Sequence, residues 1–446
     1  MAACFTLAGC VTQPPAPGAR HPTLERKIVV GYQGWYRAPG DGAEMGWWHY
    51  RAPRTNTFAP GNVGVDYWPD VSELTPAERF ATPLRHADGS TAYVFSSHNA
   101  ATVDRHFQWM RAHGIDAAFL QRFSSPMVPD TERARLHRRA ADNVLRYALA
   151  AAEHHGRGLV VMYDLSGLPA GAMDAVERDW RHLVDELNVR RSPAYQFHGG
   201  KPLVVVWGVG FNDRRAYTLD ECASLIRFLK DDPRYGGNTV MLGIPSWWRE
   251  QKNDASRDPR LHEILRLADI LSPWTPGRYR TLAAIRQHAE KLWLPDRAWC
   301  TERGIGYMPV VFPGFSWQNL KGVSNQIDRL DGRFLWEQYR LLANHGFTTI
   351  YQAMFDEMDE GTQIFKVTSD PPVGTHLLSY APLPSDYYLR LVGRAAGYFH
   401  AGRTLPERIP DFPGAPEINA YLRSKDDEIY RNGESEPVLG AAAEVR

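Results

Sequence analysis

The sequence predicts an α/β fold, a single-domain (β/α)8 (TIM) barrel with a long loop insertion after the first strand, and two observations predict it. Eight short apolar runs, rich in β-branched residues, alternate with helical stretches along the 446-residue chain. Such near-continuous hydrophobicity is typical of parallel strands that are covered on both faces. No glycine-rich phosphate-binding turn such as GxGxxG follows any of these runs, which disfavours the rival fold, an open doubly wound sheet.

The expected elements follow one another in one continuous alternation. The strand candidates span residues 28–36, 115–123, 158–167, 202–210, 238–247, 268–274, 306–315 and 348–355. The helical stretches span residues 102–114, 131–156, 170–188, 219–232, 259–269, 281–304, 332–346 and 384–399. Since every strand is followed by a helix, the chain repeats the unit from which a barrel is built.

The two ends of the chain differ from the barrel in composition. The chain divides into residues 1–10, a Pro-rich linker at 11–26, the barrel at 27–402 with an aromatic-rich insertion at 37–101, and a C-terminal extension at 403–446 that we expect to be partly disordered. The first segment ends Leu7-Ala8-Gly9-Cys10, which resembles the lipobox of bacterial lipoproteins. We therefore expect a truncated lipoprotein signal lipidated at Cys10, and a protein anchored in the bacterial cell envelope and facing the periplasm or exterior. An accidental match is the alternative.

Charge and cysteine usage exclude several classes of protein. Lys and Arg together number 51, as do Asp and Glu, and this balance gives no support for a nucleic-acid partner. No Cys or His spacing fits a metal site, so we expect no metal and no cofactor. Cys222 lies in a helical pattern and is expected to be a buried thiol, although a Cys222–Cys300 disulfide is an alternative.

Aromatic residues concentrate where the predicted strands end. In a barrel enzyme the chemistry lies at the C-terminal ends of the strands, and flat aromatic faces with interleaved polar groups suit sugars. Packing beneath the loops is the alternative for any single ring. Asp164 is either a substrate-binding residue or a strand-end cap, and His49 and Asp66 are more readily explained as loop residues than as subsite residues. The predicted substrate-binding residues are Tyr32, Trp35, Gln121, Asp164, Trp207, Trp247, Trp274, Trp317 and Asp359.

Four carboxylates follow the last predicted strand in the stretch FDEMDEGTQ, residues 355–363. Glycoside hydrolysis needs two carboxyl groups on either side of the bond, and acids that repel one another acquire separated pKa values. In a turn that bends at Gly361, Glu357 and Glu360 would both face the barrel mouth. A Ca²⁺ site and a solvated acidic loop are the alternatives, and the spacing does not match an EF-hand.

The stretch Glu357–Ile364, with its E-x-x-E-G-T-Q-I pattern, resembles the acidic motif of family 99 glycoside hydrolases, the endo-α-mannosidases. The resemblance to this group of 71/99-like proteins covers nearly the whole chain from residue 27 to 400. It implies that Glu357 deprotonates the 2-hydroxyl of the substrate to form a 1,2-anhydro sugar, and that Glu360 acts as general acid and then as general base. The sequence departs from the family motif at Asp356, Met358, Asp359 and Phe365.

The function expected from these features is a glycoside hydrolase, α-mannosidase-like and retaining, that acts on an extracytoplasmic polysaccharide or glycan. The alternatives are a xylosidase- or arabinosidase-type glycosidase and a non-catalytic glycan-binding lipoprotein. We expect a monomer that meets the membrane only through its N-terminal lipid. The sugar, the linkage and endo or exo action are not indicated.

Overall fold

The computed structural model describes residues 20–431, and the predicted lipidation site Cys10 lies outside the described residues. Within the described residues no helix is both long enough and apolar enough to cross a membrane. Cys222 and Cys300 are buried free thiols, so the alternative disulfide does not form.

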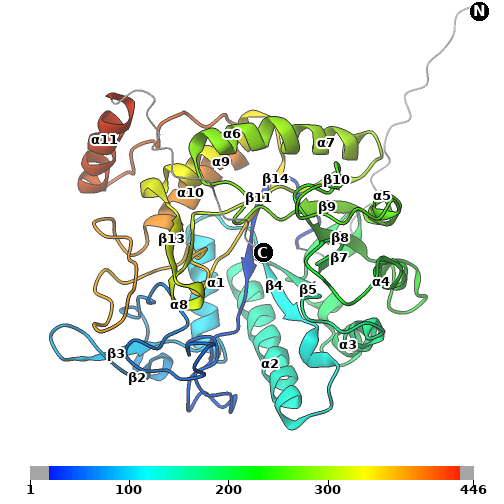
Figure 1. Cartoon of the computed structure of the whole chain (residues 1–446), viewed down its shortest axis with the longest axis horizontal. Helices are drawn as coiled ribbons and strands as arrows, with labels where there is room; N and C mark the ends of the chain where they lie inside the picture. The colour runs from blue at the N-terminus through cyan, green and yellow to red at the C-terminus, as the bar shows by residue number, and fades with distance from the viewer. Residues whose placement is uncertain (1–19, 432–446) are drawn as a thin grey trace, which may run out of the picture.

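The centre of the molecule is a ring of parallel strands in the order in which they occur along the chain (Figure 1). The strands are β1 (Lys27–Tyr32), β4 (Ala117–Phe123), β5 (Gly158–Asp164), β7 (Lys201–Trp207), β8 (Thr239–Ile244), β9 (Ile270–Pro273), β10 (Gly306–Tyr307), β11 (Val310–Val311) and β14 (Thr349–Gln352). β1 pairs with β14 as well as with β4, and all these pairings are parallel. The fold prediction of an α/β TIM barrel is confirmed.

The seventh strand of the ring is divided into two short pieces. β10 pairs with β9, whereas β11 pairs with β14, so the ring closes through a strand that changes partner at Met308 and Pro309. Proline has no N–H group to donate to a neighbouring strand. The rest of the run predicted at 306–315 leaves the ring, and β12 (Phe315–Trp317) forms an antiparallel hairpin with β13 (Val323–Ile327).

Helices cover the outside of the ring. They are α1 (Ala100–Ala112), α2 (Glu132–His155), α3 (Met173–Asp185), α4 (Leu219–Asp231), α5 (Leu261–Leu265), α6 (Leu282–His288), α7 (Leu294–Thr301), α9 (Arg333–Asn344) and α10 (Tyr387–His400). A π-helical segment, Ala289–Trp293, joins α6 to α7, so the stretch predicted as one helix at 281–304 contains two α-helices. α2 begins at the Thr131 cap, whose hydroxyl accepts from the Ala134 N–H, and ends at Gly156 with a left-handed backbone.

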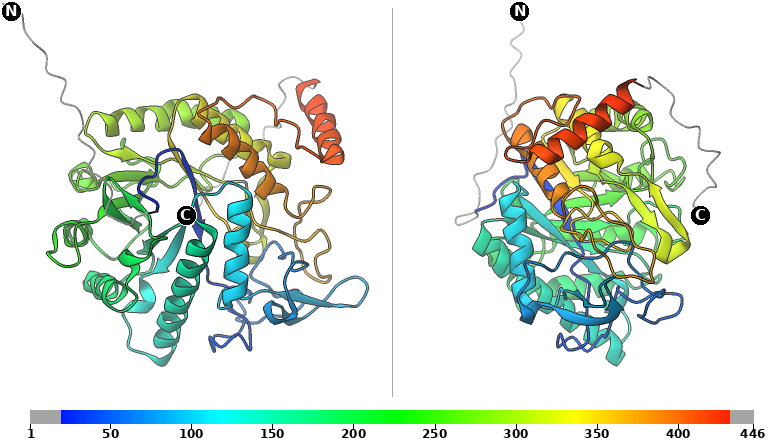
Figure 2. Two further views of the ribbon diagram at one scale, coloured as in Figure 1. Left: turned by 180° about the vertical axis from the view of Figure 1, so that it is seen from behind. Right: turned by 90° about the vertical axis from the view of Figure 1, so that its left-hand side faces the viewer.

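The insertion after β1 folds against the segment that follows β14. It contains the hairpin of β2 (Phe80–Arg85) and β3 (Thr91–Val94), and bridges join Tyr67 to Leu378 and Pro69 to Val367. The two segments lie side by side in both views of Figure 2. Two distant parts of the chain therefore form one wall beside the end of β14.

The described part of the C-terminal extension contains α11 (Pro416–Arg431), next to α9 and α10 in Figures 1 and 2. The guanidinium of Arg333 in α9 donates to the carboxylate of Asp426 at 2.7 Å and to the carbonyl of Leu422 at 2.7 Å. Residues as far as Asp426 are thus fixed to the barrel.

Candidate active site

The acidic stretch forms a tight turn directly after β14. The Phe355 N–H donates to the Gly31 carbonyl at 2.8 Å, which ties the turn to β1. Gly361 has a φ of +64°, and a Cβ at this position would lie 2.9 Å from the backbone nitrogen of Ser316. Only glycine fits this conformation and this contact. The bend predicted at Gly361 is therefore present, and Glu357 faces the loop after β1 whereas Glu360 lies near Trp317.

Asp356 fixes the loop after β1. Its side chain is completely buried, and its two oxygens accept the backbone N–H groups of Gln33 and Gly34 at 2.7 and 2.9 Å. Burial raises the pKa of Asp356 to about 7, although these hydrogen bonds lower it. Both oxygens are occupied by backbone donors, so Asp356 acts through the position of Gln33.

Glu357 lies between β1 and the end of its own turn. Its Oε1 accepts the Gln33 side-chain amide at 2.8 Å, and its Oε2 accepts the Thr362 hydroxyl at 2.9 Å. Burial raises the pKa of Glu357 well above its ordinary value, and the charges of Glu360 and Asp359 raise it further. The two donors hold the carboxylate in one orientation.

Glu360 is the most exposed of the four acids, although it is still partly buried. Burial raises its pKa to about 7, the charge of Asp359 adds to this rise, and Trp317 and Lys321 oppose it. Glu357 and Glu360 influence each other's protonation, and such a pair shares protons as one unit. A carboxyl group that titrates near neutral pH is suited to general acid and base catalysis.

Asp359 is held by two residues of the first loop. Its Oδ1 accepts the Tyr36 hydroxyl at 3.2 Å, and its Oδ2 lies 3.0 Å from His49 Nδ1. The His49 ring stacks on Trp35, with ring centroids 3.7 Å apart and planes at 7°. Trp35 also stacks on Phe123 at 5.4 Å. His49 thus belongs to the site, whereas sequence reasoning favoured a loop role.

Aromatic rings from neighbouring strands line the barrel end. Trp207 packs edge-on against Trp274 at 5.6 Å, and Trp274 lies 6.3 Å from Tyr351. Gln121 donates to the Tyr351 hydroxyl at 3.2 Å. The structure thus places the predicted residues Trp207, Trp274 and Gln121 around Tyr351, which was not among the predicted binding residues. Trp317 lies beside Glu360, on the hairpin strand β12, with Lys321 Nζ 5.5 Å from its ring.

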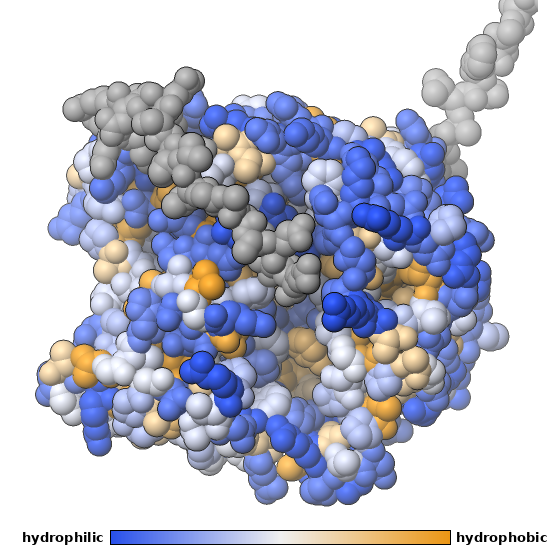
Figure 3. All heavy atoms as spheres, viewed as in Figure 1, coloured by the Kyte–Doolittle hydropathy of each residue, from blue (hydrophilic) through white to orange (hydrophobic). Residues whose placement is uncertain are grey.

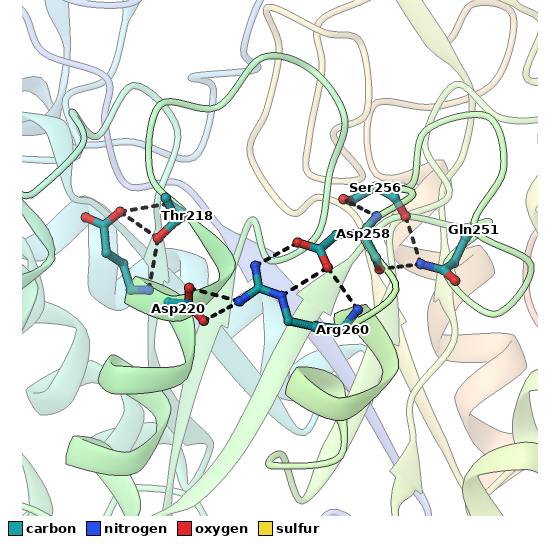
Figure 4. Close-up of polar contacts among 7 residues, drawn as sticks. Thr218, Asp220, Gln251, Ser256, Asp258 and Arg260 are labelled. Atoms are coloured by element: carbon teal, nitrogen blue, oxygen red, sulfur yellow. Dashed lines mark hydrogen bonds and ion pairs between the residues drawn. The ribbon is translucent and has the colours of Figure 1, made fainter.

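Trp247 lies on the loop after β8, and a network of polar contacts holds this loop. The Trp247 N–H donates to Asp254 at 3.0 Å. Further along the loop, Gln251 donates to the Asp258 carbonyl at 2.6 Å, and Arg260 joins Asp258 to Asp220 of α4 (Figure 4). The partly exposed Trp247 ring is therefore carried by an ordered loop.

Asp164 caps the end of β5, which was one of its two expected roles. Its Oδ1 accepts the Ser166 N–H at 2.7 Å, and burial raises its pKa. Its charge also raises the pKa of Glu360, so it lies within electrostatic reach of the acids. Asp66 is completely buried and accepts the Gln318 and Asn319 N–H groups at 2.7 and 2.8 Å, which is the loop role that was favoured for it.

Tyr32 corrects the sequence prediction. It is completely buried, its hydroxyl lies 2.9 Å from His106 of α1, and its ring packs against Phe107 at 6.1 Å. Successive residues of a strand point to opposite faces. Gly31 and Gln33 face the barrel interior and its end, so Tyr32 faces the helices. It cannot contact a substrate at the barrel mouth.

A cavity of about 250 Å³ lies between the loop after β1, β4 and α2, and none of the four acids lines it. Its lining includes Gln33, Trp35 and His49 on one side and apolar residues of β4 and α2 on the other, among them Leu120 and Val144. The face seen in Figure 3 is also hollowed near its centre, with apolar side chains inside the hollow. A concave, mostly apolar space beside polar groups is the usual form of a small-molecule site.

Several residues of the site were not singled out as binding residues from the sequence. Tyr351 could have been found from the alternation within β14, because it shares the inward face. Lys321 carries no sequence signal, whereas Thr362 lies within the E-x-x-E-G-T-Q-I pattern. Gln33 Oε1 and Trp207 Nε1 are buried and make no hydrogen bond within the described residues, which leaves both atoms for a polar ligand.

The chain is similar to solved structures of glycoside hydrolases. The GH99 endo-α-mannosidase from Bacteroides thetaiotaomicron matches with a TM-score of 0.61 at 16% identity, over 85% of this chain and 99% of that chain. Its complex with BIS-TRIS-propane matches with a TM-score of 0.60 at 15% identity, over 85% and 98%. A glycoside hydrolase-like protein matches with a TM-score of 0.51 at 13% identity, over 88% and 98%. No family model and no curated protein matches the sequence. At these identities the likeness establishes a fold shared with glycoside hydrolases.

Proposed function

We propose that the protein is a retaining glycoside hydrolase in which Glu357 and Glu360 are the catalytic residues. The observation that carries the proposal is the pair itself: a buried and a partly buried acid, both with raised pKa values, on one turn at the end of a barrel strand. A fold loses stability by burying acids that repel one another. Raised pKa values of neighbouring acids are typical of catalytic sites.

The two hydrogen bonds to Glu357 support its role as the base that removes the proton of the substrate 2-hydroxyl. Gln33 and Thr362 donate to its carboxylate, and donors of this kind favour the ionised form. Glu360 is the acid, since its pKa of about 7 lets it hold a proton at neutral pH.

The reaction proceeds in two balanced steps. In the first, the 2-hydroxyl gives its proton to Glu357, its oxygen attacks C1, and the departing glycosidic oxygen takes the proton of Glu360. In the second, Glu360 removes a proton from water, the water oxygen attacks C1 of the 1,2-anhydro sugar, and the oxygen at C2 recovers its proton from Glu357. Two inversions at C1 retain its configuration, and an intramolecular nucleophile needs no second reactant to be positioned.

The raised pKa of Glu357 supports the reverse assignment, because burial and the charges of Glu360 and Asp359 favour its protonated form. Aryl glycosides with good leaving groups distinguish the two possible assignments of acid and base. A variant that lacks the general acid keeps its activity in the first step, measured as release of the aryl leaving group, whereas a variant that lacks the base loses it. We expect Glu360→Gln to be the variant with retained activity. Retention by Glu357→Gln instead would reverse the roles.

The aromatic surfaces support a polysaccharide or glycan substrate. Trp207, Trp247 and Trp274 come from three successive strand ends, which is an arrangement suited to stacking on more than one sugar unit. We propose an α-mannoside as the first substrate to test, by analogy with the GH99 endo-α-mannosidase, and a location outside the cytoplasm, from the sequence near Cys10.

The test is a panel of α-mannan, α-glucan, xylan and arabinan oligosaccharides. Reducing-sugar release is measured for the wild type, Glu357→Gln, Glu360→Gln and the control Glu302→Gln, whose carboxylate lies on the surface in a pair with Arg303. We expect cleavage that falls by at least a hundredfold in the two site variants and is unchanged in the control. If the wild type and all variants bind an oligosaccharide and none of them cleaves it, the glycan-binding alternative is supported instead.

The anhydro route has its own test. A substrate without the 2-hydroxyl has no nucleophile, so a 2-deoxy analogue should bind and remain uncut. Cleavage of this analogue at a rate near that of the parent sugar would exclude the 1,2-anhydro route. The assignment of Glu357 and Glu360 as the catalytic residues would still stand.

A further inference from the structure

Three potential metal ligands meet on the outer helical layer of the barrel. Asp104 belongs to α1, and His154 and His155 lie at the C-terminal end of α2. The donor atoms that the three side chains offer all lie within 4.8 Å of one another. α1 and α2 lie side by side in Figures 1 and 2. The cluster therefore joins two helices through residues that are 50 positions apart, Asp104 and His154.

The distances within the cluster are close to those of ligands around one ion. His154 Nδ1 lies 2.8 Å and His155 Nε2 lies 3.1 Å from the same oxygen, Asp104 Oδ1. Ligand atoms that each lie about 2.1 Å from a tetrahedral zinc ion are roughly 3.4 Å apart. Small side-chain rotations would open the cluster enough to admit an ion.

His155 supplies a second, independent observation. Its side chain is 8% exposed, yet Nε2 makes no hydrogen bond within the described residues. The nitrogen lies at hydrogen-bond distance from Asp104 Oδ1 without being directed at it. A buried nitrogen without a partner costs free energy, and a bound cation would remove this cost by accepting its lone pair.

The cluster is open to solvent on one side. The side chains of Asp104 and His154 are 40% and 69% exposed, so an ion has a path of entry and room for a water ligand. Imidazole nitrogen and carboxylate oxygen together suit Zn²⁺ and similar divalent transition metals, and they suit Ca²⁺ and Mg²⁺ less well.

We propose that Asp104, His154 and His155 form a binding site for a divalent transition-metal ion, with Zn²⁺ as the expected occupant and water completing its coordination. The ion joins the end of α2 to α1. Its role is structural, because the C-terminal end of α2 leads into the start of β5 and hence to the face of the barrel opposite the acids. An ion that binds only the native state stabilises that state.

The experiment measures Zn²⁺ binding to the tag-free, chelator-treated full chain by calorimetry and by thermal unfolding. We expect about one equivalent to bind and to raise Tm by several degrees. Binding should weaken at least tenfold in Asp104→Asn, His154→Ala and His155→Ala. His400→Ala is the matched control and should bind like the wild type, since His400 Nε2 lies 2.8 Å from Asp116 and the two have no third metal ligand among the described residues.

The outcomes separate a metal site from an ion pair. Saturable binding that is lost in the three variants and kept in the control supports the proposal. The absence of saturable Zn²⁺ binding, or binding that is equal in all proteins, overturns it and leaves an ion pair. Asp104→Asn preserves the size of the side chain, so it reports on ligation even if a histidine variant fails to fold. Glu357→Gln should bind Zn²⁺ normally, which keeps this result independent of the catalytic proposal.

Discussion

Gly243 leaves the space that the Trp207 ring occupies, because a Cβ on Gly243 would lie 2.2 Å from Trp207 Cδ1. The two residues are partners on adjacent strands β7 and β8. The missing side chain of Gly243 therefore sets the orientation of the Trp207 ring on the neighbouring strand. Glycine serves here to admit a neighbouring ring, which is a use that depends on close approach.

The first prediction follows from this contact. Gly243→Ala should displace the Trp207 ring and raise KM several-fold for any substrate that stacks on it, with a smaller effect on kcat. Gly397→Ala is the control, because nothing lies within 4 Å of a Cβ at Gly397 and α10 should gain up to about 1 kcal/mol from alanine. Steady-state kinetics and thermal unfolding measure both effects. An unchanged KM in Gly243→Ala would show that Trp207 does not contact the substrate.

The second prediction concerns stability and pH. Burial raises the pKa of Asp356 from 3.8 and that of Glu360 from 4.5, each to about 7. A raised native pKa stabilises the folded state below the unfolded-state pKa, and this contribution disappears as the pH rises through the native value. The free energy of unfolding should therefore fall between pH 4 and 7, by on the order of 1–3 kcal/mol for each group.

Denaturant unfolding of Glu360→Gln and Glu302→Gln measures this contribution. Glu360→Gln should lose part of the pH dependence and should be more stable than the wild type at pH 8, as expected for a residue kept for function. Glu302→Gln should follow the wild-type curve. Equal pH dependence in all three proteins would contradict the raised pKa of Glu360.

The third prediction concerns the pH profile of catalysis. After burial, the charge of Asp359 is a further cause of the raised pKa of Glu360. Asp359→Asn should lower the pKa of the general acid, so the alkaline limb of the kcat/KM profile should move to lower pH. Asp370→Asn, at a position 72% exposed, should leave the limb in place. A limb that moves to higher pH in Asp359→Asn would contradict the electrostatic coupling.

The fourth prediction tests the corrected position of Tyr32. Tyr32→Phe removes the hydroxyl that meets His106, and the loss of a buried hydrogen bond costs about 1–3 kcal/mol. We expect a lower Tm and unchanged kcat and KM. Trp274→Phe, at the barrel end, should instead raise KM and leave Tm unchanged. A higher KM in Tyr32→Phe would return this residue to the substrate site.

The eight strands could be predicted because strands covered on both faces carry a continuous apolar signal. The direction of single side chains was harder to predict. Tyr32 follows a glycine at the end of β1, and only the register of the strand decides that Gln33 rather than Tyr32 reaches the acids. The division of the seventh strand was missed, because MPVVFPGF continues the apolar run of residues 306–315 past the point where β11 ends.

The acids themselves were found because four carboxylates in five positions are conspicuous in any sequence. Their partners were not, since His49 and Lys321 come from distant segments that only the folded chain brings together. The cluster of Asp104, His154 and His155 escaped for the same reason. Asp104 lies 50 positions before the adjacent His154 and His155, and the three match no metal-binding spacing.

The divided seventh strand is held to its neighbours by fewer paired residues than the strands on the other side of the barrel. β4 and β5 are paired over seven residues, whereas β10 and β11 are each paired over two. Amide hydrogens of the short pieces should therefore exchange with solvent sooner than those of β4 and β5. Trp274 and Trp317 lie before and after these short strands in the chain, and Gln121 lies on the well-paired strand β4. Under the proposed function, a bound glycan would therefore contact flexible surfaces at the two tryptophans and a rigid surface at Gln121.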